Sequence, residues 1–310
     1  MKANMLNRTH IEGVLYQHSL QKKVTGENSQ KPGTEFITGN IEIATDDAMI
    51  NIVPIHFTYV TAVTSTGKAN SAYAVLNDIV NGTAKSIMEH GKDAATKLRV
   101  DSAIGLNDFY TERDGKVELV SAKRNEGGFI HVANDGLNAD EKLRSTFEVD
   151  MIITGVRRVE AVEEKNLPEK VVIKGAIFDF RKSLLPVEFT AKNPHAMDYF
   201  EGLDASPSNP VFTKLKGRQI SETIVRQEKE EGAFGEPSIR EVRSSNKEYL
   251  VTWAAGEPYI WDDESTITVD ELKKAMGDRE TYLSTVKQRY DEYNAAKNKS
   301  SAPAAGAFNF

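Results

Sequence analysis

The feature that most constrains the fold is a strand pattern that occurs twice. Ile37-Thr38-Gly39-Asn40-Ile41 returns as Ile173-Lys174-Gly175-Ala176-Ile177, which is 136 positions later when counted from Gly39 to Gly175. The same offset carries Ile11-Glu12-Gly13 onto Phe147-Glu148-Val149. Two patterns at one spacing, each followed by further strand-like segments, indicate a duplicated small β-domain. A chance likeness between two Ile/Gly-containing strands is the alternative.

The glycine inside each repeated strand predicts a particular shape. Glycine weakens a strand unless the sheet must bend or coil at that point. Gly39 and Gly175 therefore predict long strands that curl toward the closure of a barrel.

Each half of the chain contains three predicted strands, a helical insert and two further strands. In the first half the strands are predicted at 10–20, 34–45, 51–60, 97–110 and 116–132, with helix within 71–90. In the second half they are predicted at 145–160, 170–192 with a break at Leu184-Leu185-Pro186, 211–227 and 238–254, with a helix at 195–203. This β-β-β-α-β-β order is that of the OB-fold, a five-stranded barrel.

The expected fold is mainly β, with two tandem OB-like five-stranded barrels, helical inserts, a C-terminal helix and a disordered tail. We predict a first OB-like domain at 1–143, a second at 144–262, a helix at 263–299 and a flexible tail at 300–310. Each barrel domain is long enough to bury its own core.

The C-terminal helix begins at a capping-box sequence, Thr268-Val269-Asp270-Glu271. Its apolar positions then alternate by three and four, at Val269, Leu272, Met276, Leu283, Val286, Tyr290 and Tyr293. Docking of this helix on the second barrel is the main interpretation, and a short coiled coil that forms a homo-oligomer is the alternative. The Ala/Ser/Pro-rich tether that follows ends in the partner-binding candidates Phe308 and Phe310.

Composition excludes several kinds of protein. The chain has no cysteine, which removes disulfides, thiolate catalysis and cysteine-ligated zinc. It has six scattered histidines and no nucleotide-binding or nucleophile motif, so we expect no enzyme, no cofactor and no metal. The N-terminus has no apolar signal core and no segment has the length of a membrane span, so the expected location is cytoplasmic.

The net charge of −7 is spread over the chain, and neither barrel nor the C-terminal segment is net positive. A protein that binds double-stranded DNA mainly through its overall positive charge would usually be basic, so this charge counts against such a function. A single-strand binder needs only a local groove with a few cations and aromatic faces.

One strand combines aromatic residues with cations on one predicted face. Side chains alternate between the two faces of a strand. Between 170 and 181, the alternation that buries Val171, Ile173 and Ile177 places Lys174, Phe178 and Phe180 on the other face, and Arg181 and Lys182 follow. This face would let bases stack and phosphates pair. Packing of Phe178 and Phe180 under a loop or the long helix is the equally weighted alternative.

Similar candidates occur elsewhere, although some of these aromatics must fill a barrel core. In the first half they are Tyr16, His18, Phe57, Tyr59, Lys97, Arg99, Phe109, Tyr110, Lys123 and Arg124. In the second half the start of the fourth strand adds Lys214, Lys216 and Arg218.

The chain resembles single-stranded DNA-binding proteins of the OB-fold type in four features. These are the paired β-β-β-α-β-β order, Lys97-Leu98-Arg99-Val100, Lys214-Leu215-Lys216-Gly217-Arg218 and the tail with its terminal aromatic. The pattern is most similar to those encoded by bacteriophages or prophages, and it covers most of the chain. In that family a tail ending in acidic residues and a Phe recruits replication partners. This chain keeps the tether and the Phe and lacks the adjacent acids.

The resemblance implies non-enzymatic binding and protection of single-stranded DNA during replication or recombination. Two other classes stay open at this stage. One is a structural or assembly protein of a phage particle built on β-barrels, and the other is a module that binds oligosaccharide or protein.

Overall fold

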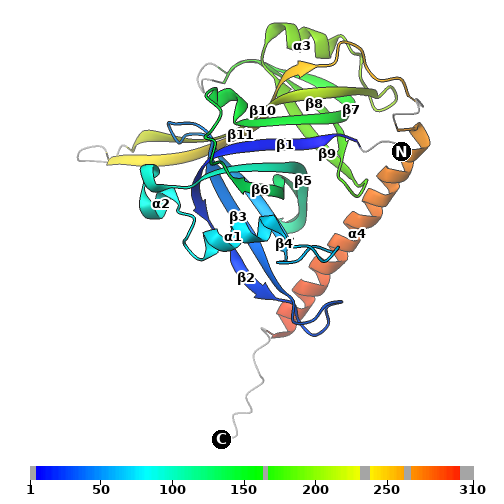
Figure 1. Cartoon of the computed structure of the whole chain (residues 1–310). Helices are drawn as coiled ribbons and strands as arrows, with labels where there is room; N and C mark the ends of the chain where they lie inside the picture. The colour runs from blue at the N-terminus through cyan, green and yellow to red at the C-terminus, as the bar shows by residue number, and fades with distance from the viewer. Residues whose placement is uncertain (1–4, 163–166, 231–237, 262–266, 301–310) are drawn as a thin grey trace, which may run out of the picture.

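The computed structural model describes residues 5–162, 167–230, 238–261 and 267–300, and only the backbone of 223–230, 238–245 and 298–300 within them. Two β-barrels lie one above the other in Figure 1, and a long helix, α4 (Val269–Ser300), runs diagonally beside both. Among the described residues, no helix combines the length and the apolar character needed to span a membrane.

The first barrel contains β1 (Asn7–His18), β3 (Glu35–Ala44), β4 (Ile52–Val60), β5 (Lys97–Arg113) and β6 (Lys116–Val132). Their order around the barrel is β1-β3-β4-β6-β5, and β5 pairs back onto β1. All neighbours are antiparallel except β4 and β6, which meet in parallel at Ile55 and His56. The barrel therefore has the strand order 1-2-3-5-4 of an OB-fold, with a short parallel seam.

The second barrel repeats this arrangement with β7 (Ser145–Val159), β8 (Lys170–Phe178), β9 (Leu184–Ala191), β10 (Val211–Glu230) and β11 (Ser238–Ala254). Its order is β7-β8-β9-β11-β10, closed by β10 on β7, with a parallel seam between β9 and β11. The predicted fold class, mainly β with two OB-like barrels, is confirmed.

The helices lie where the sequence predicts inserts. α1 (Ser71–Val80) and α2 (Ile87–His90) follow the third strand of the first barrel, and α3 (Pro194–Glu201) follows the third strand of the second. Two 3-10 turns, at Lys92–Ala94 and Glu141–Leu143, complete the connections. Leu76 and Ile79 of α1 and Met197 and Phe200 of α3 are buried against their respective barrel cores.

The two barrels are joined by their first strands. β1 and β7 pair antiparallel, from Asn7 opposite Val149 to Ile11 opposite Ser145. β1 thus pairs with strands of both barrels, and one continuous sheet, β6-β5-β1-β7-β10-β11, crosses the molecule.

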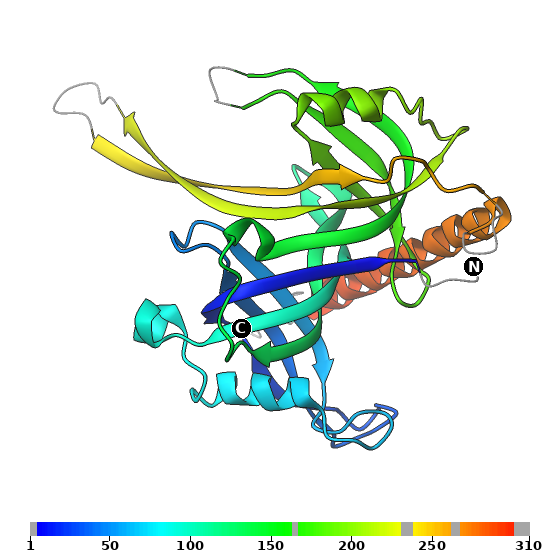
Figure 2. The same ribbon diagram turned by 45° about the horizontal axis from the view of Figure 1, so that its top comes forward.

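Each barrel sends a long hairpin that contacts the other barrel. The β5–β6 hairpin turns at Asp114 and Gly115, whose positive φ angles of 51° and 73° are those of a two-residue hairpin turn. Its Ile104 lies in the core of the second barrel. The β10–β11 hairpin projects to the left in Figures 1 and 2. It contacts the first barrel at Asn51, the residue before β4, which lies opposite Glu222.

The repeated glycines, predicted as points where strands curl, lie where two backbone segments approach closely. A Cβ on Gly175 would lie 2.0 Å from the Ile152 carbonyl oxygen, and one on Gly39 would lie 2.4 Å from that of Ser19. Gly39 also has a φ of 128°, which side chains rarely adopt. Any larger residue would push the barrel strands apart at these points.

Two local predictions are wrong. The break in 170–192 is not at Leu184-Leu185-Pro186, which begins β9, but at Asp179–Ser183. There the Asp179 carboxylate accepts hydrogen bonds from the amides of Arg181 and Ser183, an Asx turn that apolar periodicity does not reveal. A short strand, β2 (Gln21–Val24), also pairs with β3, although no strand is predicted between 20 and 34.

The helix α4 begins at the predicted capping box, where the Glu271 amide donates to Thr268 Oγ1 and the Thr268 amide donates to Glu271. Leu272 and Ala275 pack on a cluster that contains Phe178, Phe212 and Ile267 beside the second barrel. Farther along, Tyr290 contacts Tyr110 of the first barrel's hairpin. The predicted heptad seam is not buried as a unit, since Val269, Met276 and Tyr293 are exposed. The predicted tail, with Phe308 and Phe310, lies outside the described residues.

A buried carboxylate ties three elements of the second barrel together. Glu248 on β11 is 5% exposed and lies 3.3 Å from the Lys170 ammonium and 2.5 Å from that of Lys192. Burial alone would raise the pKa of this carboxyl. Hydrogen bonds from Lys192 and Thr190, with the charges of Lys192 and Lys170, outweigh burial and hold the pKa below its ordinary value.

We expect Glu248→Gln to lower the free energy of unfolding by roughly 1–3 kcal/mol at neutral pH, because it removes hydrogen bonds to a charged group. A depressed folded-state pKa contributes stability above the unfolded value, about 4.3, and loses it as the pH falls through the folded value. Urea unfolding at a series of pH values should therefore show the difference from wild type shrinking below about pH 4. A difference that stays constant into acid would contradict this role.

Candidate nucleic-acid interface

A groove of about 470 Å³ lies where the first barrel's hairpin meets the second barrel. Its lining comes from β6, through Ser121 and Lys123, and from β7, β8 and β9, through Thr154, Lys174 and Glu188. β8 and β9 are the second and third strands of their barrel, which is the face that OB-folds use for oligonucleotides and oligosaccharides.

Two lysines from different barrels meet in this groove. The Lys123 ammonium donates to the Glu188 backbone carbonyl at 2.6 Å and lies 4.9 Å from the centre of the Tyr249 ring. The Lys174 ammonium lies 3.2 Å from the Glu188 carboxylate and its side chain is half exposed. The groove lining contains these two ammonium groups and one carboxylate, that of Glu188, which leaves a local excess of positive charge.

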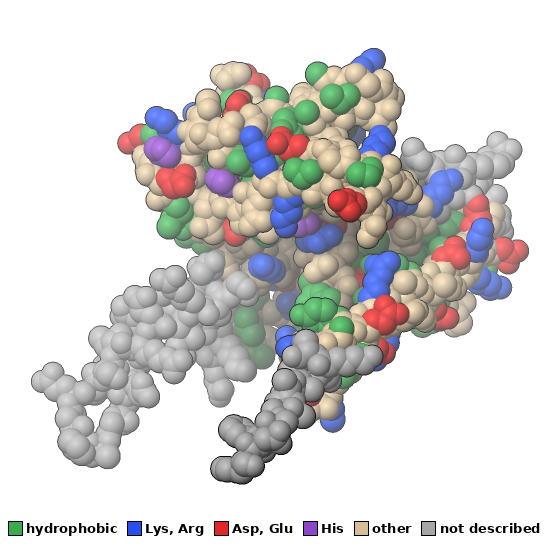
Figure 3. Space-filling model, turned by 90° about the horizontal axis from the view of Figure 1, so that it is seen from below, with side chains coloured by type: hydrophobic (Ala, Val, Ile, Leu, Met, Phe, Trp, Pro, Cys, Tyr) green, Lys and Arg blue, Asp and Glu red, His purple; other side chains and the backbone are tan. Residues whose placement is uncertain are grey.

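The hairpin also presents an aromatic ring and a cation on its other side. Arg124 lies opposite Gly105, which is four residues before Phe109 on β5, so Phe109 and Arg124 project to the same face. Phe109 is 40% exposed. The Arg124 guanidinium is held by the Glu126 carboxylate at 2.6 Å. Burial, and then the positive charge of Arg124, lower the pKa of the nearby His56 imidazole, which therefore adds little charge at neutral pH. Figure 3 shows Lys and Arg side chains around a hollow between the first barrel and α4.

Two of the predicted stacking residues are core residues instead. Phe57 is 2% exposed in the core of the first barrel, and Phe178 is fully buried in the cluster beneath α4. Phe178 does point away from Ile173 and Ile177, as predicted, but α4 covers that side. Because both rings are buried, their prediction as nucleic-acid-binding residues is wrong.

The other predicted aromatics differ in accessibility. Phe180 is 85% exposed with the Arg181 guanidinium 5.1 Å from its ring, and Tyr59 is 48% exposed beside Phe36. Tyr110 packs on Tyr290 of α4, with ring centres 6.0 Å apart. Tyr16 and His18 on β1 are half-buried.

The remaining predicted cations lie outside the groove lining. Arg99 is held by Glu12 at 2.7 Å and by Asp135, and Lys214 and Lys216 share Glu148. Arg218 lines a different cleft beside Gln219 and Glu222. Arg181, Lys182 and Lys97 are exposed. Of the predicted cations, the groove lining contains Lys123 and Lys174.

Residues 6–289 match the model of the YorF family. The chain belongs to the YorF family. Two solved structures of the single-stranded DNA-binding protein from Thermus aquaticus, the wild type and a deletion mutant, resemble this YorF-family chain at 10% identity, with TM-scores of 0.45 and 0.44. The matches cover 84% of this chain and 96% and 97% of theirs. No curated protein matches the chain.

Two exposed aromatics of this YorF-family protein are not among the predicted site residues. Trp253 is 47% exposed and Phe129 is 77% exposed. Alternation with Tyr249 and Val251 predicts Trp253 to be buried, but a register shift places Val251 opposite Gly217 and Trp253 opposite Lys216, which turns the indole outward. Sequence periodicity carries no signal for that shift.

Proposed function

We propose that this protein binds single-stranded DNA without catalysing a reaction on it. The observation that carries the proposal is the meeting of Lys123 and Lys174, one from each barrel, on the second-and-third-strand face of an OB-fold. Such barrels bind single strands through cationic grooves flanked by aromatic faces.

In this proposal the two ammonium groups pair with phosphates, and bases stack on the exposed rings of Phe109, Tyr59 and Phe180. The chain as a whole has a net charge of −7, so we expect few counterions to be released on binding. Affinity then depends on stacking as well as on charge, and the dependence on salt is shallow. The role that fits this chemistry is the covering of exposed strands in replication or recombination, in the cytoplasm of a bacterial cell that hosts a phage or prophage.

The test replaces both groove lysines with glutamine, which keeps a hydrogen-bonding side chain and removes the charge. We expect Lys123→Gln/Lys174→Gln to weaken binding of labelled oligo-dT about tenfold or more in fluorescence anisotropy. Each lost phosphate contact should also reduce the slope of log affinity against log salt by about 0.7 for a single strand.

The matched control is Lys68→Gln/Lys85→Gln, which removes the same charge at two exposed lysines outside the groove. It should leave the salt slope unchanged. Equal losses in both double variants would show that only net charge matters, and a wild-type protein that binds no oligo-dT would reject the proposed function.

A further inference from the structure

The continuous sheet that joins the barrels carries a cross-strand row of charged residues that ends in an exposed tryptophan. Arg8 on β1 lies opposite Glu148 on β7, Glu148 lies opposite Lys216 on β10, and Lys216 lies opposite Trp253 on β11. Residues opposite one another in an antiparallel sheet project to the same face, so these four side chains are neighbours.

This row holds more positive than negative charge. The Lys216 ammonium lies 3.1 Å from Glu148 and 5.1 Å from the centre of the Trp253 ring, and the Lys214 ammonium lies 3.8 Å from the same carboxylate oxygen. Arg8 lies opposite the same glutamate, and Asp150 lies opposite Lys214, so three cations and two carboxylates gather here.

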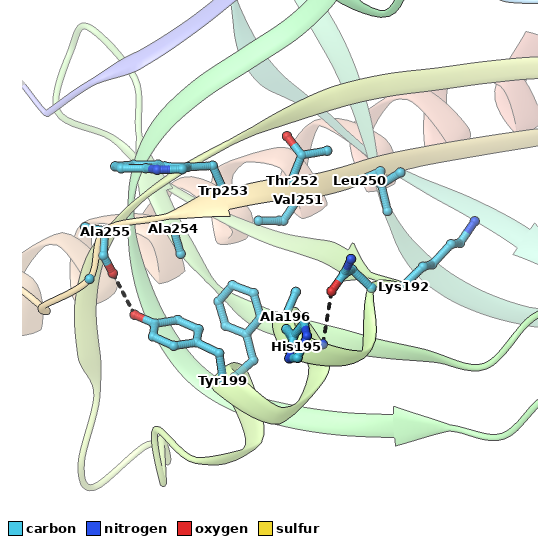
Figure 4. A pocket seen from close by; sticks show the side chains of 13 residues that line it. Lys192, His195, Ala196, Tyr199, Leu250, Val251, Thr252, Trp253, Ala254 and Ala255 are labelled. Carbon is cyan, nitrogen blue, oxygen red and sulfur yellow. Dashed lines mark hydrogen bonds between the residues drawn. The ribbon is translucent and has the colours of Figure 1, made fainter.

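A cleft of about 620 Å³ opens along the row. Arg8, His10, Glu148, Lys216 and Trp253 are among its lining residues. A second cleft of about 500 Å³ lies between β11 and α3, where Figure 4 shows the Trp253 indole on the far side of β11 from Tyr199 and His195. There Tyr199 donates to the Ala255 carbonyl and Asn193 accepts from the His195 amide, so these polar groups are already satisfied. Trp253 lines both clefts, and the first also contains Arg8 and Lys216 of the charged row.

We propose that the cleft at Trp253 is a second contact site for the same DNA strand, in which one base stacks on the indole and the adjacent phosphates pair with Arg8 and Lys216. This inference rests on the proposed function and extends it to a surface separate from the Lys123–Lys174 groove. β11 connects the two sites, because Lys123 lies over Tyr249 and Trp253 follows four residues later, about 13 Å along a strand that rises ~3.3 Å per residue. A short oligonucleotide fills one site, and a longer one reaches both.

Phe129 provides a matched control on the same sheet. It is more exposed than Trp253 and also lies beside a register shift, between Asp101 and Ala103. The residue opposite it is Asp101, whereas the residue opposite Trp253 is Lys216. A base stacked on Phe129 would bring its phosphate near the Asp101 carboxylate, and the two negative charges repel. Phe129→Ala should therefore leave binding unchanged.

The experiment uses the intrinsic fluorescence of the protein, which has only two tryptophans. Trp261 packs on Phe212 and donates to the Pro210 carbonyl, so Trp261→Phe leaves Trp253 as the sole reporter. Oligo-dT from about 4 to about 30 nucleotides is titrated into this variant, a range that spans the site sizes of OB-folds. We expect quenching of Trp253 only above a length that exceeds the shortest bound oligomer.

Affinity gives an independent measurement in the otherwise wild-type chain. Trp253→Ala should weaken binding of the long oligomer about tenfold and leave binding of the shortest bound oligomer unchanged.

The outcomes separate this inference from the proposed function. One outcome is binding that depends on Lys123 and Lys174 while Trp253 is not quenched and Trp253→Ala binds like the wild type at every length. This outcome overturns the second site and leaves the proposed binding in the Lys123–Lys174 groove intact. Trp253 fluorescence that changes with protein concentration in the absence of DNA identifies a contact between copies and also overturns it. Absence of binding at any length overturns both.

Discussion

Phe178→Ala lowers the free energy of unfolding by about 3–5 kcal/mol, the usual cost of removing a large aromatic side chain from a packed interior. Phe178 is fully buried among Leu184, Phe212, Ile267 and residues of α4. Phe180, two residues away, is 85% exposed and serves as the matched control. Urea denaturation should show a large fall in stability for the first variant and none for the second.

The same pair of variants separates core from binding surface. Phe180→Ala should weaken oligo-dT binding at unchanged stability if its ring stacks on a base, a contact worth roughly 1–3 kcal/mol. A Phe180→Ala variant that unfolds as early as Phe178→Ala would show that the two rings share one core, contrary to their exposures.

Arg279→Met should lower the free energy of unfolding by a similar amount, about 3–5 kcal/mol, because it leaves a buried charge unpaired. Arg279 on α4 donates two hydrogen bonds to Asp108 on the first barrel's hairpin, at 2.9 and 2.7 Å, and the two side chains are 10% and 2% exposed. Asp108 accepts one more hydrogen bond, from Ser121, and no other cation shares the pair among the described residues.

Two comparisons make this prediction specific. Arg289→Met, on the exposed side of the same helix, should have little effect. The double variant Asp108→Leu/Arg279→Met should recover most of the loss, since replacing both members of a buried pair by apolar residues is often neutral. A double variant no more stable than Arg279→Met would show that the loss comes from helix packing and not from the unpaired carboxylate.

The architecture could be predicted from the sequence because its signals are local. The succession of strands in each half and the capping box at Thr268 both depend on residues within a few positions of one another. The joining of β1 to β7 depends on residues more than a hundred positions apart. The contact of the β5–β6 hairpin with the second barrel joins Lys123 to Glu188, which are 65 positions apart. Apolar periodicity carries no information about such partners.

The site could be predicted only in part, for a related reason. Parity correctly placed Phe178 away from Ile173 and Ile177, but it cannot show that α4 covers that side. Parity also predicts Trp253 to be buried, and the register shift between β10 and β11 reverses its direction. Lys123 and Lys174 were both recognisable as cations on strands, yet their meeting in one groove follows from the long hairpin.

The antiparallel pairing of β1 with β7 constrains how a linear ligand with two different ends can contact both barrels. Because equivalent first strands run in opposite directions, the two barrels are related by an approximate two-fold rotation. A strand of DNA has a 5′ and a 3′ end, so one that crosses both barrels in a straight line meets the second in the reverse sense to the first. Equal use of equivalent surfaces would require the strand to turn back on itself. A straight strand must instead contact each barrel through different residues, and covalent linkage in one chain leaves the two barrels free to differ in this way.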